Sequence, residues 1–268
     1  MIPIANLMVS SAGVGPDLVL LHAGIADRRM WASQIGDFSR EFRVTSYDLR
    51  GFGESPMTPG PYAHFRDLRT ILDHLGIERA ALIGASMGGS VALDFALENP
   101  DRVSALLLVD PGLDGYRFQD PWLKGRWQES EAALERGDFE DAARIESETW
   151  LAGPERSLDQ VDGSLRELVR TMLLGSYPAA AAGGIEEGPD TPSIERLEQI
   201  RVPMLVVVGE HDVPDMKRIA ELLEQRIPEA TLVTIEGAAH LPSLERPAEF
   251  HRIARQFLTR ALGPGPPR

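Results

Sequence analysis

The amino-acid sequence predicts an α/β fold: a mostly parallel central sheet with helices on both faces and an inserted helical cap. Two observations lead to this prediction. Over most of the 268 residues, apolar runs of strand length alternate with longer helical patterns, as they do in βα units. Between residues 112 and 193 the strand rhythm stops, and charged helical segments with Trp122, Trp127 and Trp150 take its place.

The expected strands begin with an edge strand over residues 4–10. Six further apolar runs bounded by Gly, Pro or charged residues are expected strands: 18–21, 43–47, 80–83, 105–109, 204–208 and 231–235. Helical patterns lie between these strands, and Pro or Gly residues end two of the patterns. The expected helices are 64–75, 88–98, 215–226 and 246–262.

The interruption of the strand rhythm sets the expected domain boundaries. Residues 1–111 and 194–262 form the α/β core, residues 112–193 form the helical cap insertion, and residues 263–268 form a flexible tail. The segment from Ala179 to Pro192 is rich in Ala, Gly and Pro, so we expect it to be a flexible return from the cap to the core.

Charge and composition exclude several classes of protein. The net charge of −14 argues against nucleic acid and anionic membranes as partners, because both need a basic face. Without cysteine, the chain has no disulfide, no thiolate nucleophile and no Cys-ligated metal. The N-terminus lacks the positive segment of a signal peptide, and no apolar run approaches the ~18 residues of a membrane span. We therefore expect a soluble cytoplasmic protein with a small-molecule partner; a homo-oligomer is possible.

The clearest chemical signal is the sequence Gly-Ala-Ser-Met-Gly-Gly at 84–89, a G-x-S-x-G pattern directly after the strand at 80–83. At such a strand-to-helix junction, a sharp turn strains the serine backbone and holds its hydroxyl above the sheet edge, while the glycines let neighbouring backbones approach. The following helix points its positive end at the site. These features predict Ser86 as a nucleophile.

An acid and a histidine follow Ser86 along the chain, each after a later strand. The order Ser, Asp, His is the one in which a hydrolase of this topology carries its triad. Asp212 follows the strand at 204–208, and His240 follows the strand at 231–235. Because ligands bind at the carboxyl ends of parallel strands, we expect both beside Ser86. A serine hydroxyl needs a base to take its proton, and a carboxylate holds that base in the right tautomer.

Two alternatives to these assignments stay open. Asp110 also ends a strand and could supply the acid; its other interpretation is a polar cap at the strand end. His211 is adjacent to Asp212, but it precedes the last strand, which is the wrong order for the base. None of the six histidines shows the H-x-x-x-H spacing of zinc proteases, so we expect no metal and no cofactor.

The oxyanion that forms during acyl transfer needs two fixed backbone donors. One is the N–H of Met87, the residue after the nucleophile. The other comes from the loop after the strand at 18–21, which reads His-Ala-Gly-Ile at 22–25. We expect the N–H of Gly24 to be this donor, with Ile25 as the second choice.

These motifs and several others make the chain resemble the α/β-hydrolase superfamily over almost its whole length. Within it, the chain resembles the small cap-bearing group of 3-oxoadipate enol-lactonases, haloperoxidase-type esterases and carbon–carbon bond hydrolases. One departure is Ala23, where many members carry Gly. The motifs that carry the resemblance are His22-Ala23-Gly24, Met30-Trp31, 47–55, 84–89, 99–103, Gly209-Glu210-His211-Asp212 and 237–242.

The resemblance implies the α/β-hydrolase fold and hydrolysis of a carboxylic ester or lactone through an acyl-enzyme, with a triad of Ser86, His240 and Asp212. Haloalkane dehalogenases and epoxide hydrolases carry Asp at the elbow and dienelactone hydrolases carry Cys, so Ser86 argues against these reactions. A carbon–carbon bond hydrolase of the meta-cleavage-product type and a non-catalytic ligand-binding homologue remain alternatives. Expected apolar contacts with the substrate are Ile25, Trp122, Trp127, Met172 and Leu241.

The charge of the substrate can also be predicted. The field of a net charge of −14 slows anionic substrates. A guanidinium could still pair with a substrate carboxylate, and the candidates lie after the oxyanion loop and in the cap: Arg28, Arg29, Arg117 and Arg126. We expect a neutral ester or lactone with a short to medium acyl group.

Overall fold

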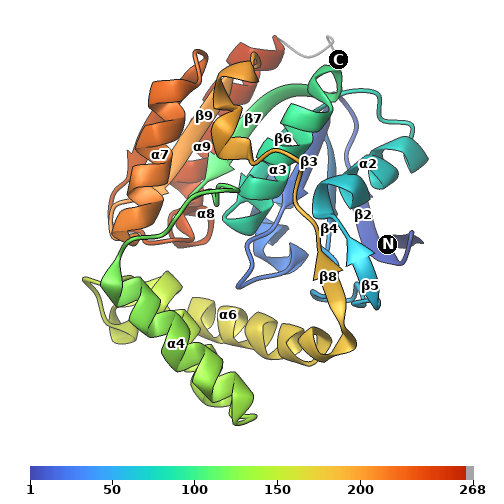
Figure 1. Cartoon of the computed structure of the whole chain (residues 1–268). Coiled ribbons are helices and arrows are strands. Elements are labelled where there is room, and N and C mark those ends of the chain that lie inside the picture. The colour runs from blue at the N-terminus through green and yellow to red at the C-terminus, as the bar shows by residue number, and fades with distance from the viewer. Residues whose placement is uncertain (264–268) are drawn as a thin grey trace.

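The computed structural model describes residues 1–263, without the side chains of residues 180 and 181; the rest of the predicted tail, 264–268, lies outside the described residues. An eight-stranded sheet forms its centre, in the order β1-β2-β4-β3-β6-β7-β9-β10 (Figure 1). Strand β2 pairs antiparallel with β1 and β4, and the other neighbours are parallel. The strands are β1 (Ile2–Ile4), β2 (Leu7–Ala12), β3 (Asp17–Leu21), β4 (Arg43–Tyr47), β6 (Ala80–Ala85), β7 (Val103–Val109), β9 (Met204–Gly209) and β10 (Ala230–Ile235).

The N-terminal strand predicted over residues 4–10 is wrong. The structure has a hairpin there, in which Ile4 of β1 faces Leu7 of β2. Ala5 and Asn6 form the two-residue turn, with φ angles of 50° and 68°. A tight hairpin turn with positive φ at both central residues matches the twist of the strands, and asparagine tolerates this conformation. The six other predicted strands are confirmed, within two residues at each end.

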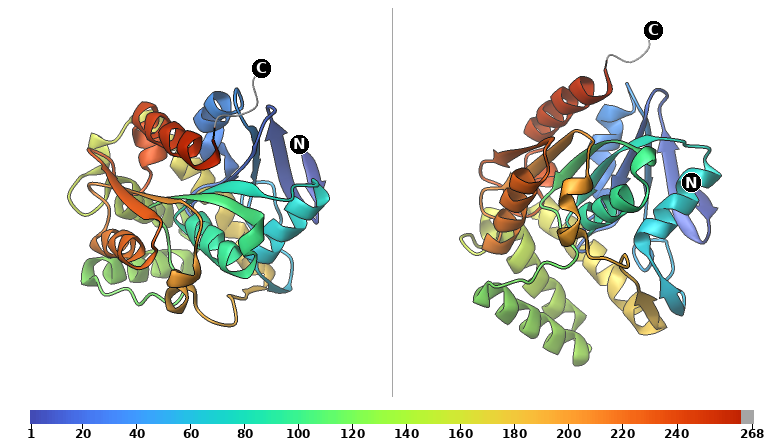
Figure 2. Two further views of the ribbon diagram at one scale, coloured as in Figure 1. Left: turned by 90° about the horizontal axis from the view of Figure 1, so that it is seen from above. Right: turned by 45° about the horizontal axis from the view of Figure 1, so that its top comes forward.

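Helices cover both faces of the sheet (Figure 2). Helix α1 (Ala32–Phe38) packs with α9 (Pro247–Leu262) on one face, and α2 (His64–His74), α3 (Met87–Glu98) and α7 (Pro214–Arg226) cover the other. This double cover explains why β6 and β9 are buried along their whole length. Among the described residues, no helix is both long and apolar enough to cross a membrane.

The segment between β7 and β9 is mainly helical, as predicted, and its long helices lie below the sheet in Figure 1. It contains α4 (Pro121–Glu135), α5 (Phe139–Glu146), the π-helical segment η3 (Ser147–Ala152) and α6 (Gly163–Ser176). The return to the core, which we expected to be flexible, includes a short strand, β8 (Gly184–Glu186). Strand β8 pairs in parallel with β5 (Gly60–Tyr62) of the core, so backbone hydrogen bonds fasten this part of the return.

Candidate active site

Ser86 lies on the predicted strained turn, between the last residue of β6 and the first of α3, with φ 50° and ψ −113°. The two glycines of the motif make this turn possible. A Cβ at Gly84 would lie 2.3 Å from the carbonyl oxygen of Gly88, and a Cβ at Gly88 would lie 2.4 Å from that of Leu21. The N–H of Ser86 donates to the carbonyl of Val109 at 2.9 Å, which fastens the turn to the end of β7. A positive φ on a non-glycine residue is costly, and it persists only where the surrounding structure holds it.

His240 and Asp212 are joined at the neighbouring strand ends. His240 Nδ1 lies 2.7 Å from Asp212 Oδ2, and each residue is only 1% exposed. Asp212 Oδ1 accepts the N–H of Val213 at 2.7 Å, next to the positive N-terminus of α7. With the proton on Nδ1, the Nε2 atom of His240 is free to act as a base. The hydrogen bonds of the described residues include none between Ser86 and His240, and catalytic bonds often form only with substrate present.

The structure also places the two alternatives to this pair. Asp110 follows β7, and its Oδ1 accepts the N–H of Gly209 at 3.1 Å. Single ligand-type atoms of Asp110, Asp212 and His240 all lie within 4.8 Å of one another, which is close enough to hold a metal ion. The 2.7 Å bond between Asp212 and His240 instead makes those two a hydrogen-bonded pair. His211 faces away, toward Glu155, with its Nδ1 3.2 Å from a carboxylate oxygen.

His22 shapes the loop predicted to hold the oxyanion. It is fully buried, and burial lowers the pKa of His22, which favours the neutral ring. Its Nδ1 donates to the carbonyl of Ala23 at 2.9 Å, and its Nε2 accepts the N–H of Leu49 at 2.8 Å. The ring therefore fixes the start of the loop from the inside.

Gly24 brings this loop against the nucleophile turn. A Cβ at Gly24 would lie 3.7 Å from Cβ and Sδ of Met87, and the N–H of Gly88 donates to the carbonyl of His22 at 3.1 Å. Neither the Gly24 nor the Met87 amide donates a hydrogen bond to another group of the described chain. Two unused amides beside Ser86 are what an oxyanion requires.

A tryptophan of the cap packs on the histidine, and the sequence analysis did not assign it a role. The ring centroid of Trp150 lies 4.4 Å from that of His240, and the Trp150 carbonyl accepts the N–H of His240 at 3.2 Å. Trp150 Nε1 donates to Glu146 at 2.9 Å, which orients the indole. Its signal in the sequence is weak, because a π-helical turn changes the side-chain period on which helical patterns depend.

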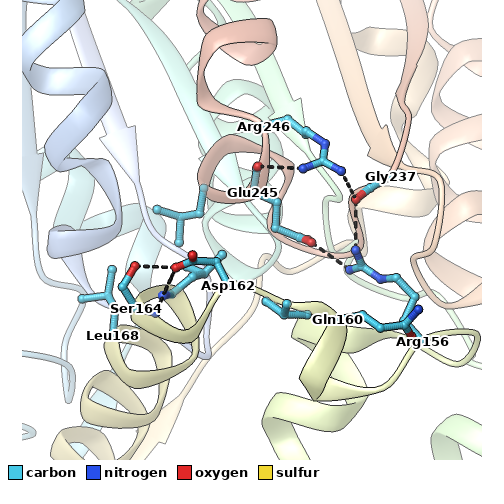
Figure 3. Close-up of a pocket in the computed structure, with 11 residues that line it drawn as sticks. Arg156, Gln160, Asp162, Ser164, Leu168, Gly237, Glu245 and Arg246 are labelled. Carbon is cyan, nitrogen blue, oxygen red and sulfur yellow. Dashed lines mark hydrogen bonds and ion pairs between the residues drawn. The ribbon is translucent and has the colours of Figure 1, made fainter.

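Arg156 joins the cap to the loop that carries His240. It donates to the carbonyl of Gly237 at 3.0 Å and to Glu245 at 2.8 Å, beside a cavity of about 390 Å³ (Figure 3). Glu245 in turn accepts the N–H of Ala239 at 2.7 Å. Both charged side chains are nearly buried, so removing either would leave the other unpaired.

The five side chains predicted to contact the substrate lie in different environments. The ring of Trp127 lies 6.4 Å from that of Trp150, the tryptophan that packs on His240. Trp122 is 37% exposed on α4, a position that gives no support to a substrate contact. The other three are buried in the hydrophobic core: Ile25, Met172 and Leu241.

A second cavity, of about 290 Å³, lies beside Met87 and is lined by several acidic side chains. One of them is Asp94 of α3, whose Oδ1 accepts the hydroxyl of Ser193 at 2.5 Å. Burial raises the pKa of Asp94 to about 7. The folded protein therefore binds a proton there over a pH range in which the unfolded chain does not.

Asp94→Asn is expected to change how stability depends on pH. Because the folded pKa lies above the unfolded value of 3.8, the contribution of Asp94 to stability is fully present below that value and is lost as the pH rises through about 7. The variant should therefore melt at a higher temperature than the parent at about pH 8 and show a smaller fall in Tm from about pH 5. Calorimetry of parent and variant between about pH 5 and pH 8 measures these melting temperatures. The exposed Asp159→Asn is the control, and equal slopes for parent and Asp94→Asn would contradict the prediction.

The sheet order, the serine turn and the acid–histidine pair define the class of this protein. The chain belongs to the alpha/beta hydrolase fold family, whose model matches residues 16–247. It is 28% identical over 259 residues to the pimeloyl-[acyl-carrier protein] methyl ester esterase of Aeromonas salmonicida, covering 94% of this chain and 99% of that protein. The family and fold predicted from the sequence are confirmed.

Solved structures of esterases and of an enol-lactonase share this fold. A thermophilic esterase from Thermogutta terrifontis, with malate bound, superposes with a TM-score of 0.78 at 32% identity, covering 95% of this chain and 93% of that one. The enol-lactonase from Burkholderia xenovorans LB400 superposes with a TM-score of 0.77 at 25% identity, covering 94% and 96%.

Proposed function

We propose that the protein is a serine esterase that hydrolyses a carboxylic ester or lactone through an acyl-enzyme on Ser86. The chain is an ester hydrolase of the alpha/beta hydrolase fold, the class to which its relatives named methyl ester esterase, carboxylesterase and enol-lactonase belong. The observation that supports the mechanism best is the 2.7 Å bond between His240 Nδ1 and Asp212, at the same edge of the sheet as the strained Ser86. The predicted location remains the cytoplasm.

The residues perform a two-step acyl transfer. Ser86 Oγ attacks the ester carbonyl while its proton passes to His240 Nε2, and Asp212 stabilises the imidazolium that forms. The amides of Met87 and Gly24 hold the oxyanion. As the intermediate collapses, the bond to the alcohol oxygen breaks and His240 gives that oxygen its proton. Water then attacks the acyl-enzyme with His240 as base, which releases the acid and restores Ser86.

Mass spectrometry of the enzyme during turnover tests this proposal. With p-nitrophenyl acetate and acid quenching, we expect a fraction of the protein to gain one acetyl group, and digestion should locate it on the peptide that contains Ser86. Release of p-nitrophenol should show a burst before the steady state. An adduct on another residue would contradict the mechanism. Neither adduct nor turnover, with the ester still bound, would favour the ligand-binding homologue.

We also propose that the substrate is neutral. Three of the four candidate arginines are paired within the protein: Arg28 with Asp48 and Glu54, Arg29 with Asp27, and Arg126 with Glu129 and Glu148. The cavity beside Met87 adds further acidic groups, among them Asp114 and Glu187. A carboxylate on the substrate would meet repulsion there, with no free cation from these three arginines to offset it.

A pair of matched substrates tests this preference. We expect kcat/KM for a neutral ester to exceed that for its analogue with a distal carboxylate by about tenfold or more, equal to about 1.4 kcal/mol in transition-state binding. The comparison should be repeated at high salt, where screening reduces the difference. A tenfold preference for the anionic analogue would favour an enol-lactonase with a carboxylate-bearing substrate.

A further inference from the structure

Asp110 is a buried acid at the active site that the proposed mechanism does not use. It follows β7 with a φ of 43°, and its exposed fraction is 0%. Gly209 donates its N–H to Asp110 Oδ1 at 3.1 Å. The other oxygen, Oδ2, is buried and receives no hydrogen bond from any donor of the described chain. A buried carboxylate oxygen without a donor is costly if the group is charged.

The neighbours of Asp110 make a second negative charge there unfavourable. Burial, and next the charge of Asp212, raises the pKa of Asp110 well above its ordinary value. Glu245 adds a smaller effect of the same sign. Single ligand-type atoms of the two acids lie within 4.8 Å of each other. A hydrogen bond between two carboxyl groups needs one proton, because two carboxylates offer only acceptors.

Donors around the two acids decide which one carries the proton. Asp212 accepts two bonds of 2.7 Å, from the N–H of Val213 and from His240 Nδ1, and it lies near the N-terminus of α7. Asp110 accepts one, from Gly209 at 3.1 Å. Donors and a helix N-terminus stabilise an anion, so the charge belongs on Asp212 and the proton on Asp110.

We propose that Asp110 is a positioning residue that carries a proton and donates it in a hydrogen bond to the Asp212 carboxylate. The acids at the ends of β7 and β9 then act as one hydrogen-bonded unit behind His240. Asp110 holds the orientation of Asp212, and it withdraws charge from the carboxylate that faces the imidazole. This inference rests on the proposed esterase function, in which His240 is the base.

Two substitutions of Asp110 test the inference by kinetics. Asp110→Asn keeps a neutral donor at this position, whereas Asp110→Ala removes it. We expect Asp110→Asn to retain a kcat/KM about tenfold or more above that of Asp110→Ala, since a buried donor is lost only in the alanine variant. The acid limb of the pH profile, which reports protonation of the base, should stay within about 0.3 pH unit in Asp110→Asn and move to higher pH in Asp110→Ala.

Two results would overturn the inference. If Asp110 is an anion, Asp110→Asn removes a negative charge near His240, and the acid limb should move to lower pH by about one unit. If both variants have the same kcat/KM and the same pH profile, Asp110 only fills space. Melting temperatures of both variants show whether they fold.

An infrared measurement tests the proton without any need for activity. The wild-type minus Asp110→Asn difference spectrum at neutral pH should contain the carbonyl band of a protonated carboxylic acid. Asp94 is present in both proteins, so its contribution cancels. Absence of the band overturns the inference even in an active enzyme. A band in a protein that hydrolyses no ester would leave the inference about the proton intact while contradicting the proposed function.

Discussion

Ser86→Ala is expected to lose nearly all esterase activity while keeping the fold. Without Oγ no acyl-enzyme can form, and only the oxyanion donors and substrate binding remain, which together give ~10³-fold to 10⁴-fold over water. We expect kcat to fall by ~10⁴-fold or more. Stability should hold, because the strain of the turn comes from the backbone at φ 50° and alanine is no larger than serine. Turnover of p-nitrophenyl acetate and the melting temperature should be measured on the same preparation.

Ser104→Ala, at the opposite end of β7 from the site, is the matched control and should keep full activity. If Ser86→Ala retained turnover within about tenfold of the parent, the triad assignment would fail. A drop in Tm as large as the drop in activity would instead point to lost folding.

Asp212→Asn is expected to lower kcat by ~10⁴-fold, since an amide that donates to Nδ1 places the imidazole in the wrong tautomer. The bond it alters is the 2.7 Å contact between Asp212 Oδ2 and His240 Nδ1. KM should change much less, because neither group binds the substrate before the reaction starts. Steady-state kinetics with a neutral ester separates the two constants.

Asp110→Asn is the comparison for this prediction. It changes a buried acid of the same cluster without touching the hydrogen bond to His240, so its loss of kcat should be far smaller. Losses of equal size would mean that the two acids share the role. A larger loss for Asp110→Asn would reverse the assignment.

The central part of the fold and the positions of the candidate catalytic side chains could be predicted because their signals are local. The parallel strands β6 and β9 are buried along their whole length and read as continuous apolar runs. The elbow at 84–89 combines strand, turn and helix in six residues. Asp212 and His240 follow from strand order, since the carboxyl ends of parallel strands meet at one edge.

Features that depend on distant contacts could not be predicted in this way. Strands β5 and β8 have three residues each and pair across more than a hundred residues of sequence, so neither carries a strand pattern of its own. The contact of Trp150 with His240 and the ion pair of Arg156 with Glu245 join the cap to the core. Periodicity reports which face of an element is buried, and it does not report what covers that face.

The contact between Trp150 and His240 limits how this enzyme can be redesigned. Transplanting a cap from a relative to change the substrate range assumes that the cap and the core are independent modules. Here the cap supplies an aromatic ring and a backbone acceptor to His240, and Arg156 fastens the loop on which His240 lies. A chimera should therefore keep residues 147–156 with the core and draw its diversity from α4 and the segments that flank it.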